Sequence, residues 1–197
     1  MRPDLEIICD WIKPSCQLLD LGCGDGTLLA YLQENKQVQG YGLEIDADNI
    51  TKCLEKGVNV IEQDLDEDDL SHFEDKSFDV VIMTQALQAV KYPDIMLDEM
   101  LRMGNECIVT FPNFGHWSLR CYLAFKGQMP MSKTLPYTWY NTPNIHLCTF
   151  KDFEALCLQK KICIKRRTVV DNSHQARWFN RFSPNLLGQV AIYQVAK

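Results

Sequence analysis

The residues Leu18–Gly26, which read LLDLGCGDG, constrain the fold of this chain more than any other segment. An apolar run ends here in three glycines at alternate positions, and a helical pattern begins at once at Thr27. Glycine tolerates positive φ and lets ligand atoms approach a backbone where a Cβ would collide. A strand that turns through such glycines into a helix forms a nucleotide pocket at the carboxyl end of the strand. The segment therefore predicts an α/β fold with a nucleotide site.

The glycine spacing and a nearby acid discriminate between two kinds of nucleotide. In the dinucleotide fingerprint G-x-G-x-x-G, Gly22 and Gly24 would fit, but the third glycine here is Gly26 and threonine follows it. Asp20 lies at the end of the strand, two residues before the first glycine. A carboxylate at that place would repel a pyrophosphate and attract a cation, such as the amino group of a methionine moiety.

Two further acids follow the next two predicted strands. Glu44 comes at the end of the second strand pattern and suits a ribose diol, because a carboxylate accepts hydrogen bonds from both hydroxyls. Asp64 follows the third apolar run, at the depth where an adenine would lie. Three acids around one cleft favour S-adenosylmethionine (SAM), which carries a positive sulfonium and no phosphate. The alternative is a glycine-rich β-turn with incidental acids.

We therefore predict a site for SAM or its product S-adenosylhomocysteine (SAH). Its expected residues are Asp20, Gly22, Cys23, Gly24, Gly26, Glu44, Ile45, Asp64, Leu65 and Thr84. Cys23 lies near a helix N-terminus, which can lower a thiol pKa, but we favour a packed loop residue over a nucleophile.

Length and charge narrow the class of protein. A chain of 197 residues predicts one domain, spanning residues 1–197. A formal net charge of −6 gives no general attraction to nucleic acid, and the basic run at 160–167 is typical of a solvated strand face. The apolar runs are too short to span a membrane, and the first residues lack the apolar core of a signal peptide. We expect a cytoplasmic protein without nucleic-acid or membrane partners.

Cysteine usage agrees with that compartment. The chain has nine cysteines, an odd number, and none of them forms a C-x-x-C pair. Several fall inside strand or helix patterns as small apolar residues. This usage indicates a reducing compartment and predicts neither a disulfide framework nor a metal site.

The hydrophobic pattern alternates strands with helices. The predicted strands are 17–21, 38–45, 58–61, 78–84, 106–111, 162–170 and 188–195, and the predicted helices are 5–12, 27–34, 47–56, 94–103 and 151–160. Five strand–helix units and a terminal strand pair predict a mostly parallel sheet with helices on both faces.

One segment, 112–147, is too long for an ordinary connection after the fifth strand. It is rich in aromatic residues and contains a possible helix over 117–125. We expect this insertion to lie over the carboxyl edge of the sheet. There it would act as a lid on the pocket, bind an acceptor or meet another protein.

These features resemble known families. The acid of the first strand, the alternate glycines and the acids after strands two and three resemble the Rossmann-like class I SAM-dependent methyltransferase fold. That fold implies a seven-stranded sheet with an antiparallel last strand. Leu18–Gly26, together with TFPNFGHW at 110–117 and TPNIHLCTF at 142–150, resembles the methionine biosynthesis protein MetW family. The last two segments are the more specific, because the general fold does not require them.

The family resemblance implies a partner. MetW-like proteins are associated with a homoserine O-acyltransferase of the MetX type, whose acylation step they are thought to support. SAM, the downstream product of that pathway, would then be a feedback signal. The resemblance thus implies an accessory subunit rather than an independent catalyst. Trp117, Tyr122, Trp139 and Tyr140 would either anchor the partner or pack the insertion onto the sheet.

The alternative is a SAM-dependent methyltransferase that acts on a small acceptor. His116 or His146 would be its base, with Tyr137 or Tyr140 as an orienting donor. A lone histidine in an aromatic segment is more often a packed residue, so we assign no catalytic residue. The Asn-Pro-Pro-aromatic motif of many amino-methylating enzymes is replaced by TQAL at 84–87. We therefore favour the accessory subunit.

Overall fold

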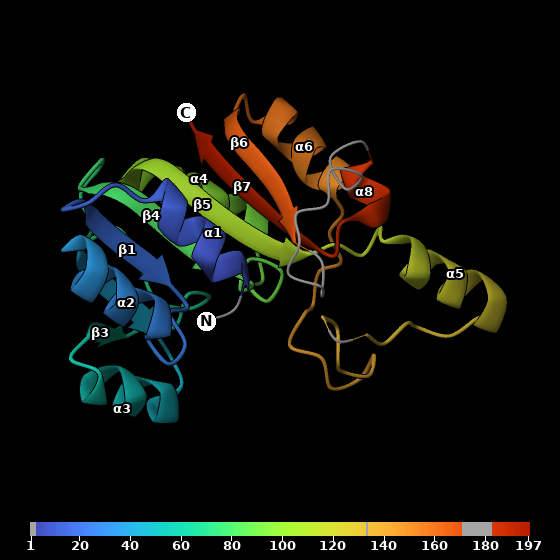
Figure 1. Ribbon diagram of the computed structural model, residues 1–197, viewed down its shortest axis with the longest axis horizontal. Coiled ribbons are helices and arrows are strands. Elements are labelled where there is room, and N and C mark those ends of the chain that lie inside the picture. Colours follow the sequence, from blue (N-terminus) through green and yellow to red (C-terminus); the bar gives the residue numbers. More distant parts are fainter. Residues whose placement is uncertain (1–2, 133, 171–182) are drawn as a thin grey trace.

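A seven-stranded sheet runs through the computed structural model, which describes residues 3–132, 134–170 and 183–197 (Figure 1). The strand order is β3-β2-β1-β4-β5-β7-β6. Strands β1 to β5 pair in parallel, whereas β7 is antiparallel to both β5 and β6. The strands are β1 (Gln17–Leu21), β2 (Gln39–Glu44), β3 (Asn59–Glu62), β4 (Phe78–Thr84), β5 (Gly104–Pro112), β6 (Cys163–Val170) and β7 (Val190–Ala196). The predicted mostly parallel sheet with an antiparallel last strand is confirmed.

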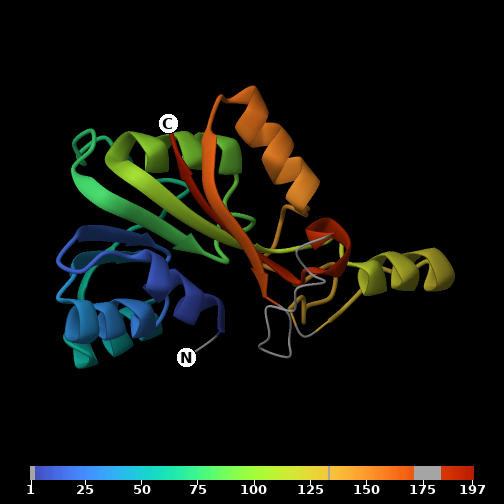
Figure 2. The same cartoon turned by 45° about the horizontal axis from the view of Figure 1, so that its top comes forward.

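Helices cover both faces of this sheet (Figures 1 and 2). They are α1 (Pro3–Trp11), α2 (Thr27–Lys36), α3 (Ala47–Glu55), α4 (Pro93–Met103), α5 (Trp117–Lys126), α6 (Phe150–Gln159) and α8 (Pro184–Leu187). The predicted ends of strands and helices lie within two residues of the observed ones. The sequence pattern missed α8, because four residues that begin with a proline show no helical periodicity.

Two hydrophobic cores form because neighbouring residues of a strand point to opposite faces. Leu18 of β1 belongs to the core that packs against α1 and α2, and the next residue, Leu19, belongs to the core that packs against α4 and α6. Val80 and Val81 of β4 divide in the same way. A strand buried on both faces reads as a continuous apolar run, which is the pattern that identified β4 in the sequence.

The insertion leaves the sheet at the end of β5 and returns to it before α6. Its helix α5 lies off the edge where the parallel strands end, but it points away from the sheet in both views (Figures 1 and 2). At its start, the Asn113 side chain donates to the carbonyl oxygens of Asn185 and Gly188. At its end, the His146 amide donates to the Gln88 carbonyl, which follows β4. The insertion is therefore fastened at both ends.

Among the helices of the described residues, none combines the length and the apolar composition that a membrane span requires.

The close packing of β2 against the glycine loop gives a stability prediction. A Cβ on Gly42 would lie 2.4 Å from the Cys23 sulfur and 2.9 Å from the Cys23 Cβ. Gly42→Ala should therefore lower the free energy of unfolding by about 1–3 kcal/mol through overpacking. Urea denaturation measures this loss. The loss should shrink in a Cys23→Ala background, since the closest clash is with the sulfur; an equal loss in both backgrounds would contradict the packing argument.

Candidate cofactor site

A cavity of about 330 Å³ opens at the carboxyl end of β1, where the glycine loop leads into α2. We call it the glycine-loop cavity. It is lined by Leu5, Asp20, Gly22, Cys23, Gly24, Asp25, Thr27, Leu28 and Thr84. The structure thus brings together the predicted Asp20, Gly22, Cys23 and Gly24 with Thr84 of β4. The predicted Gly26 and Glu44 are not among the described residues that line this cavity. Sequence reasoning missed Asp25, Thr27 and Leu28, which follow the assigned loop positions, and Leu5 from α1. Nothing in the sequence pattern distinguishes Leu5 from an ordinary core leucine.

The loop follows a path that requires glycine. Gly22, Gly24 and Gly26 have φ values of 71°, 58° and 72°, in the left-handed region that side chains disfavour. A Cβ on Gly26 would lie 2.8 Å from the Cys53 sulfur, so this glycine serves helix packing. Apart from its chain neighbours, a Cβ on Gly24 would meet no atom of the described residues within 4 Å. Gly24 therefore borders open space on the cavity side.

The amide groups of the loop are used within the protein. Gly22 and Cys23 donate to the Leu43 carbonyl at 2.9 and 3.0 Å, and Gly24 donates to Glu44 Oε2 at 2.7 Å. A phosphate site would instead need such amides free to face the ligand. The loop geometry therefore disfavours a pyrophosphate, as the acids in the sequence predicted.

Glu44 fixes the glycine loop to the end of β2. Its other oxygen, Oε1, accepts hydrogen bonds from the amides of Ile45 and Asp46, both at 3.0 Å. A carboxylate offers about four acceptor positions, so one remains for a ribose hydroxyl. The sequence placed Glu44 at the cofactor, but it did not reveal the bond to Gly24. No spacing rule predicts a contact between a strand end and the loop of the preceding strand.

Asp20 supplies a carboxylate at the wall of the cavity. It is only 1% exposed and lies in register between Gly42 of β2 and Ile82 of β4. The cavity also carries Asp25, and the described residues that line it include no lysine or arginine. Because Asp25 is paired with Lys56, it is the Asp20 carboxylate that would favour a cationic group over an anion.

Asp25 belongs to an ion pair at the rim. Lys56, which follows α3, donates to the Asp25 carboxylate and carbonyl at 2.7 Å each, and to the Thr27 hydroxyl at 2.8 Å. These bonds, with Lys56 the main cause, lower the pKa of Asp25 from 3.8 to about 2. The rim thus ties the end of α3 to the glycine loop.

The Cys23 thiol packs against α3. Its sulfur lies 3.8 Å from that of Cys53, which donates to the Gly24 carbonyl at 3.2 Å. Burial, followed by the nearby charge of Asp20, raises the pKa of Cys23 well above its ordinary value. Such a thiol stays protonated, so the structure favours the packed residue over a nucleophile.

The remaining predicted cofactor residues lie at the ends of β2 and β3. Ile45 is 57% exposed beside Glu44. Asp64 lies in a turn, where its carboxylate accepts from the Asp66 amide at 2.8 Å. Leu65 packs against the core next to a different cavity, lined in part by Val90. Within the described part of the chain, none of these three lines the glycine-loop cavity. Their contact with an adenosine stays a prediction.

The residues considered for acid–base chemistry lie elsewhere. His116 caps α5 by accepting from the Ser118 amide, and burial lowers its pKa. His146 faces the Lys91 carbonyl, and Tyr137 is exposed on the insertion. None of the three is among the described residues that line the glycine-loop cavity. In the described ranges, no three or more His, Cys, Asp or Glu side chains are grouped to hold a metal ion.

Comparisons with known proteins agree on a family and a fold. The family model described as methionine biosynthesis protein MetW matches residues 2–195. A curated relative from Rhodopirellula baltica, named bifunctional methionine biosynthesis protein MetXA/MetW, is 33% identical over 201 residues. The match covers 98% of this chain but 32% of the relative, so the chain spans about a third of that protein's length.

The solved structures similar to this one include SAM-dependent methyltransferases. One from Mesorhizobium loti has a TM-score of 0.70 at 14% identity, covering 99% of this chain and 98% of that one. The plantazolicin methyltransferase BpumL, in complex with SAH, has a TM-score of 0.64 at 16% identity, covering 99% of this chain and 80% of that one. At these identities the likeness establishes the fold.

The rim ion pair gives a titration prediction. Lys56→Met removes the main cause of the low pKa, so the titration midpoint of Asp25 should rise from about 2 toward 3.8. Carboxyl-carbon NMR measures this midpoint. Because the folded-state pKa is depressed, the carboxylate contributes stability above pH 3.8 that is lost as the pH falls toward 2.

Lys52→Met is the matched control, since Lys52 contacts Asn49 on the same helix. An unmoved Asp25 midpoint in Lys56→Met would show that the ion pair does not set this pKa.

Proposed function

The chain belongs to the MetW family of methionine biosynthesis proteins, and from this premise we propose that it is a SAM- or SAH-binding accessory subunit of a homoserine O-acyltransferase of the MetX type. The observation that carries the proposal is the relative whose name joins MetXA to MetW. When one organism carries two proteins fused in one chain, the corresponding separate chains of another organism are good candidates to bind each other. This chain corresponds to about a third of that relative, which leaves room there for a second protein.

The shape and charge of the glycine-loop cavity support the cofactor part of the proposal. The Asp20 carboxylate suits the positive charge of SAM, while Gly24 leaves room for ligand atoms close to the backbone. Glu44 retains an acceptor position for a ribose hydroxyl. SAH shares the amino group and the ribose, so the same residues serve both compounds.

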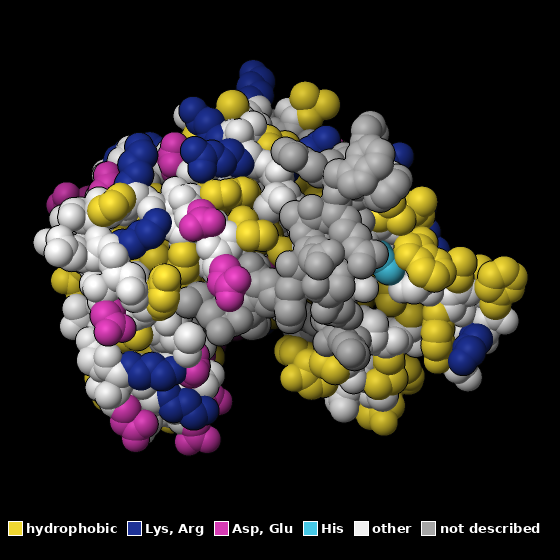
Figure 3. All heavy atoms as spheres, in the orientation of Figure 1, with side chains coloured by type: hydrophobic (Ala, Val, Ile, Leu, Met, Phe, Trp, Pro, Cys, Tyr) yellow, Lys and Arg dark blue, Asp and Glu magenta, His cyan; other side chains and the backbone are white. Residues whose placement is uncertain are grey.

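The exposed face of the insertion supports the partner part. We call residues 117–147 the aromatic arm, whose apolar side chains gather at the right of Figure 3. Phe125 is 88%, Trp139 76% and Tyr140 72% exposed. For Trp139 and Tyr140 this exposure argues against the alternative, in which they pack the insertion onto the sheet. Of the other two residues considered, Trp117 is 51% exposed and Tyr122 is partly buried. Large exposed aromatic residues in one region are typical of a protein interface.

A continuous path joins the cavity to the arm. Thr84 lines the cavity at the end of β4, and Gln88 lies four residues farther along. The Gln88 carbonyl accepts from the His146 amide, and its side chain donates to Asn144 at 3.0 Å. Bound cofactor would alter the partner's activity only if it binds the two states of the complex with different affinity. This segment is the route by which we expect the coupling to pass.

The alternative function, an independent methyltransferase, is supported only by the fold that this chain shares with solved methyltransferases. A methyltransferase needs an acceptor held in line with the donor methyl, with any base close to it. The four residues considered for that role, His116, His146, Tyr137 and Tyr140, lie outside the set of described residues that lines the glycine-loop cavity. We therefore assign the accessory role in preference to independent catalysis.

Gly24 provides a direct test of the cofactor site. Gly24→Ala should weaken SAM binding at least tenfold, because the new methyl group enters the space reserved for the ligand. Isothermal titration calorimetry measures the affinity. Gly57→Ala is the matched control: Gly57 also has positive φ and no protein atom within 4 Å of its Cβ, but it lies beyond α3. Both variants should lose about 1–2 kcal/mol of stability. Equal SAM affinity in both would refute the assigned site.

The aromatic arm provides the partner test. Addition of the chain to a MetX-type acyltransferase should raise the rate of homoserine acylation. The double variant Trp139→Ser, Tyr140→Ser should reduce this stimulation at least tenfold, as expected for two anchors that contribute about 2 kcal/mol each. It should leave SAM affinity unchanged. Leu158→Ser, at an equally exposed position on α6, is the control.

Two results would overturn the accessory role. One is an acyltransferase whose rate and co-purification are unaffected by the chain. The other is transfer of a labelled methyl group from SAM to homoserine or its esters by the isolated chain.

A further inference from the structure

Helix α5, which begins the aromatic arm, is covered by very little of the protein. Of its ten residues only Leu119 is buried, and the helix points away from the sheet in both ribbon views (Figures 1 and 2). An isolated helix shorter than about 12 residues is marginal in water, because most helical stability comes from an apolar face packed on a neighbour. The helix therefore lacks the neighbour that its sequence calls for.

The exposed side chains of α5 form one continuous face. Trp117, Cys121 and Phe125 are four residues apart, so they lie one above the other along the helix. Trp117 is 51% and Phe125 88% exposed, and the Cys121 thiol between them is exposed too. Arg120 is exposed beside this row, whereas Leu119 lies on the opposite side. We call Trp117, Arg120, Cys121 and Phe125 the α5 face. Anchors at such spacing are typical of a helix that lies in an apolar groove of another protein.

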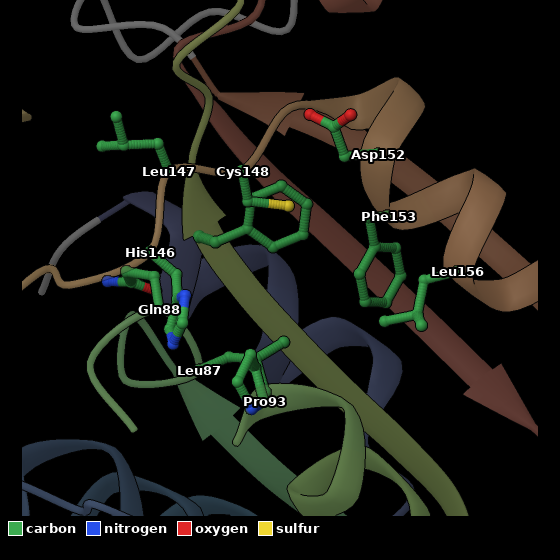
Figure 4. A pocket seen from close by; sticks show the side chains of 10 residues that line it. Leu87, Gln88, Pro93, His146, Leu147, Cys148, Asp152, Phe153 and Leu156 are labelled. Atoms are coloured by element: carbon green, nitrogen blue, oxygen red, sulfur yellow. The ribbon is translucent and has the colours of Figure 1, made fainter. Parts of the chain in front are cut away.

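The arm is fastened at its root, so it presents α5 from a fixed base. Figure 4 shows His146, near the returning end of the arm, beside Gln88 at the wall of a cavity of about 170 Å³. The His146 amide donates to the Gln88 carbonyl at 3.0 Å, and the Gln88 side chain donates to Asn144 at 3.0 Å. An element held in this way loses less conformational freedom when it binds, which favours an interface.

The charge of the arm is opposite to that of the rest of the chain. Residues 107–151 contain no aspartate or glutamate, although the whole chain has 26 of them. The arm has Arg120, Lys126 and Lys133, a formal charge of +3, whereas the whole chain carries −6. The residues outside the arm therefore have a net charge of −9. Aromatic side chains together with positive charge are complementary to an apolar surface that carries carboxylates.

The cations on α5 keep donors for such carboxylates. Arg120 Nε donates to the Gly115 carbonyl at 2.5 Å, and Lys126 Nζ lies 4.7 Å from the centre of the Tyr122 ring. Neither contact involves a carboxylate. A guanidinium has five N–H donors and an ammonium three, so both side chains can pair with an acid of another molecule.

An anionic membrane is the other surface that attracts bases and aromatic side chains. Lipid-binding segments typically hold about four to eight Lys or Arg residues. The arm has three, and anionic lipids would repel a chain whose net charge is −6. The relative whose name joins MetXA to MetW points to a protein instead.

We propose that the α5 face docks as a helix into an apolar groove of the partner protein, and that acidic side chains line the edge of this groove. The inference rests on the proposed function, which names a MetX-type acyltransferase as the partner. It adds the element that binds and the chemistry of the surface that receives it. Trp117 and Phe125 enter the groove, and Arg120 pairs with a carboxylate at its edge.

Two native thiols measure this docking directly. Cys121 on the α5 face and Cys163 on β6 are both exposed. Each is alkylated with N-ethylmaleimide, with and without a saturating amount of the acyltransferase, and the extent is followed by mass spectrometry. Cys121 should react at least tenfold more slowly in the complex, because the groove covers it, whereas Cys163 should keep its rate. An unchanged Cys121 rate in a complex that forms would overturn the proposal.

Charge reversal tests the acidity of the groove. Arg120→Glu should weaken binding of the acyltransferase at least tenfold, measured by calorimetry, because it places like charges together. Arg120→Lys gives up the Nε contact to Gly115 but keeps the charge, so it should retain most of the affinity. Lys151→Glu, at an exposed base outside the arm, is the control and should change the affinity less than twofold. Equal losses in Arg120→Glu and Arg120→Lys would contradict an acidic groove.

The outcomes separate this inference from the proposed function. A wild-type chain that neither binds nor stimulates the acyltransferase would refute the proposed function and this inference with it. Stimulation in a complex that leaves Cys121 fully reactive would refute this inference alone. Two further results would also overturn it: co-sedimentation of the chain with phosphatidylglycerol vesicles, and a dimer of the chain that protects Cys121 without the acyltransferase. They would assign the α5 face to a membrane or to a second copy.

Discussion

The bond between Glu44 and the Gly24 amide holds together the part of the molecule on which its function depends. Three glycines in left-handed conformation give the loop after β1 little stiffness of its own. The end of β2 supplies the missing constraint: the Leu43 carbonyl accepts two loop amides and Glu44 accepts a third. Because β1 and β2 pair in parallel, their carboxyl ends meet at one edge, and one strand can fix the loop of the other. The cavity is the space that this loop leaves open.

The same bonds decide which chemistry the loop can serve. Amides that point into a cavity bind phosphate, but here they point to β2 and are occupied. What faces the cavity is the Asp20 carboxylate, together with the bare backbone of Gly24. The loop therefore offers negative charge and room, which suits a cationic nucleoside. A glycine motif alone does not distinguish these two designs, whereas the direction of its amides does.

The sequence predicted those features that follow from periodicity or from the ends of parallel strands. The alternation of strand and helix patterns predicted the mostly parallel sheet, and the position of Asp20 at the end of a strand placed it at the cavity. The sequence did not predict contacts between side chains that are distant along the chain, because no local pattern encodes them. The Gln88 side chain is such a case, since it donates to the Gln85 carbonyl and, across the insertion, to Asn144. Likewise, the aromatic content of the insertion predicted that it contacts either the sheet or another molecule, but it did not predict that the insertion points away from the sheet.

The segment after β4 is where these separate features meet. Thr84 borders the glycine-loop cavity, and Gln88 binds the end of the aromatic arm. Between them, Gln85 has a φ of 56°, a conformation that a non-glycine residue rarely adopts. Its amide donates to the Thr110 carbonyl and hydroxyl of β5, and its side chain donates to Asp4 of α1. Strain of this kind persists only where the surroundings enforce it. A ligand that displaced Thr84 or Gln88 would therefore change the conformational energy of Gln85. If binding at the Thr84 end changes the affinity at the Gln88 end, thermodynamic reciprocity requires that binding at the Gln88 end change the affinity at the Thr84 end by the same factor.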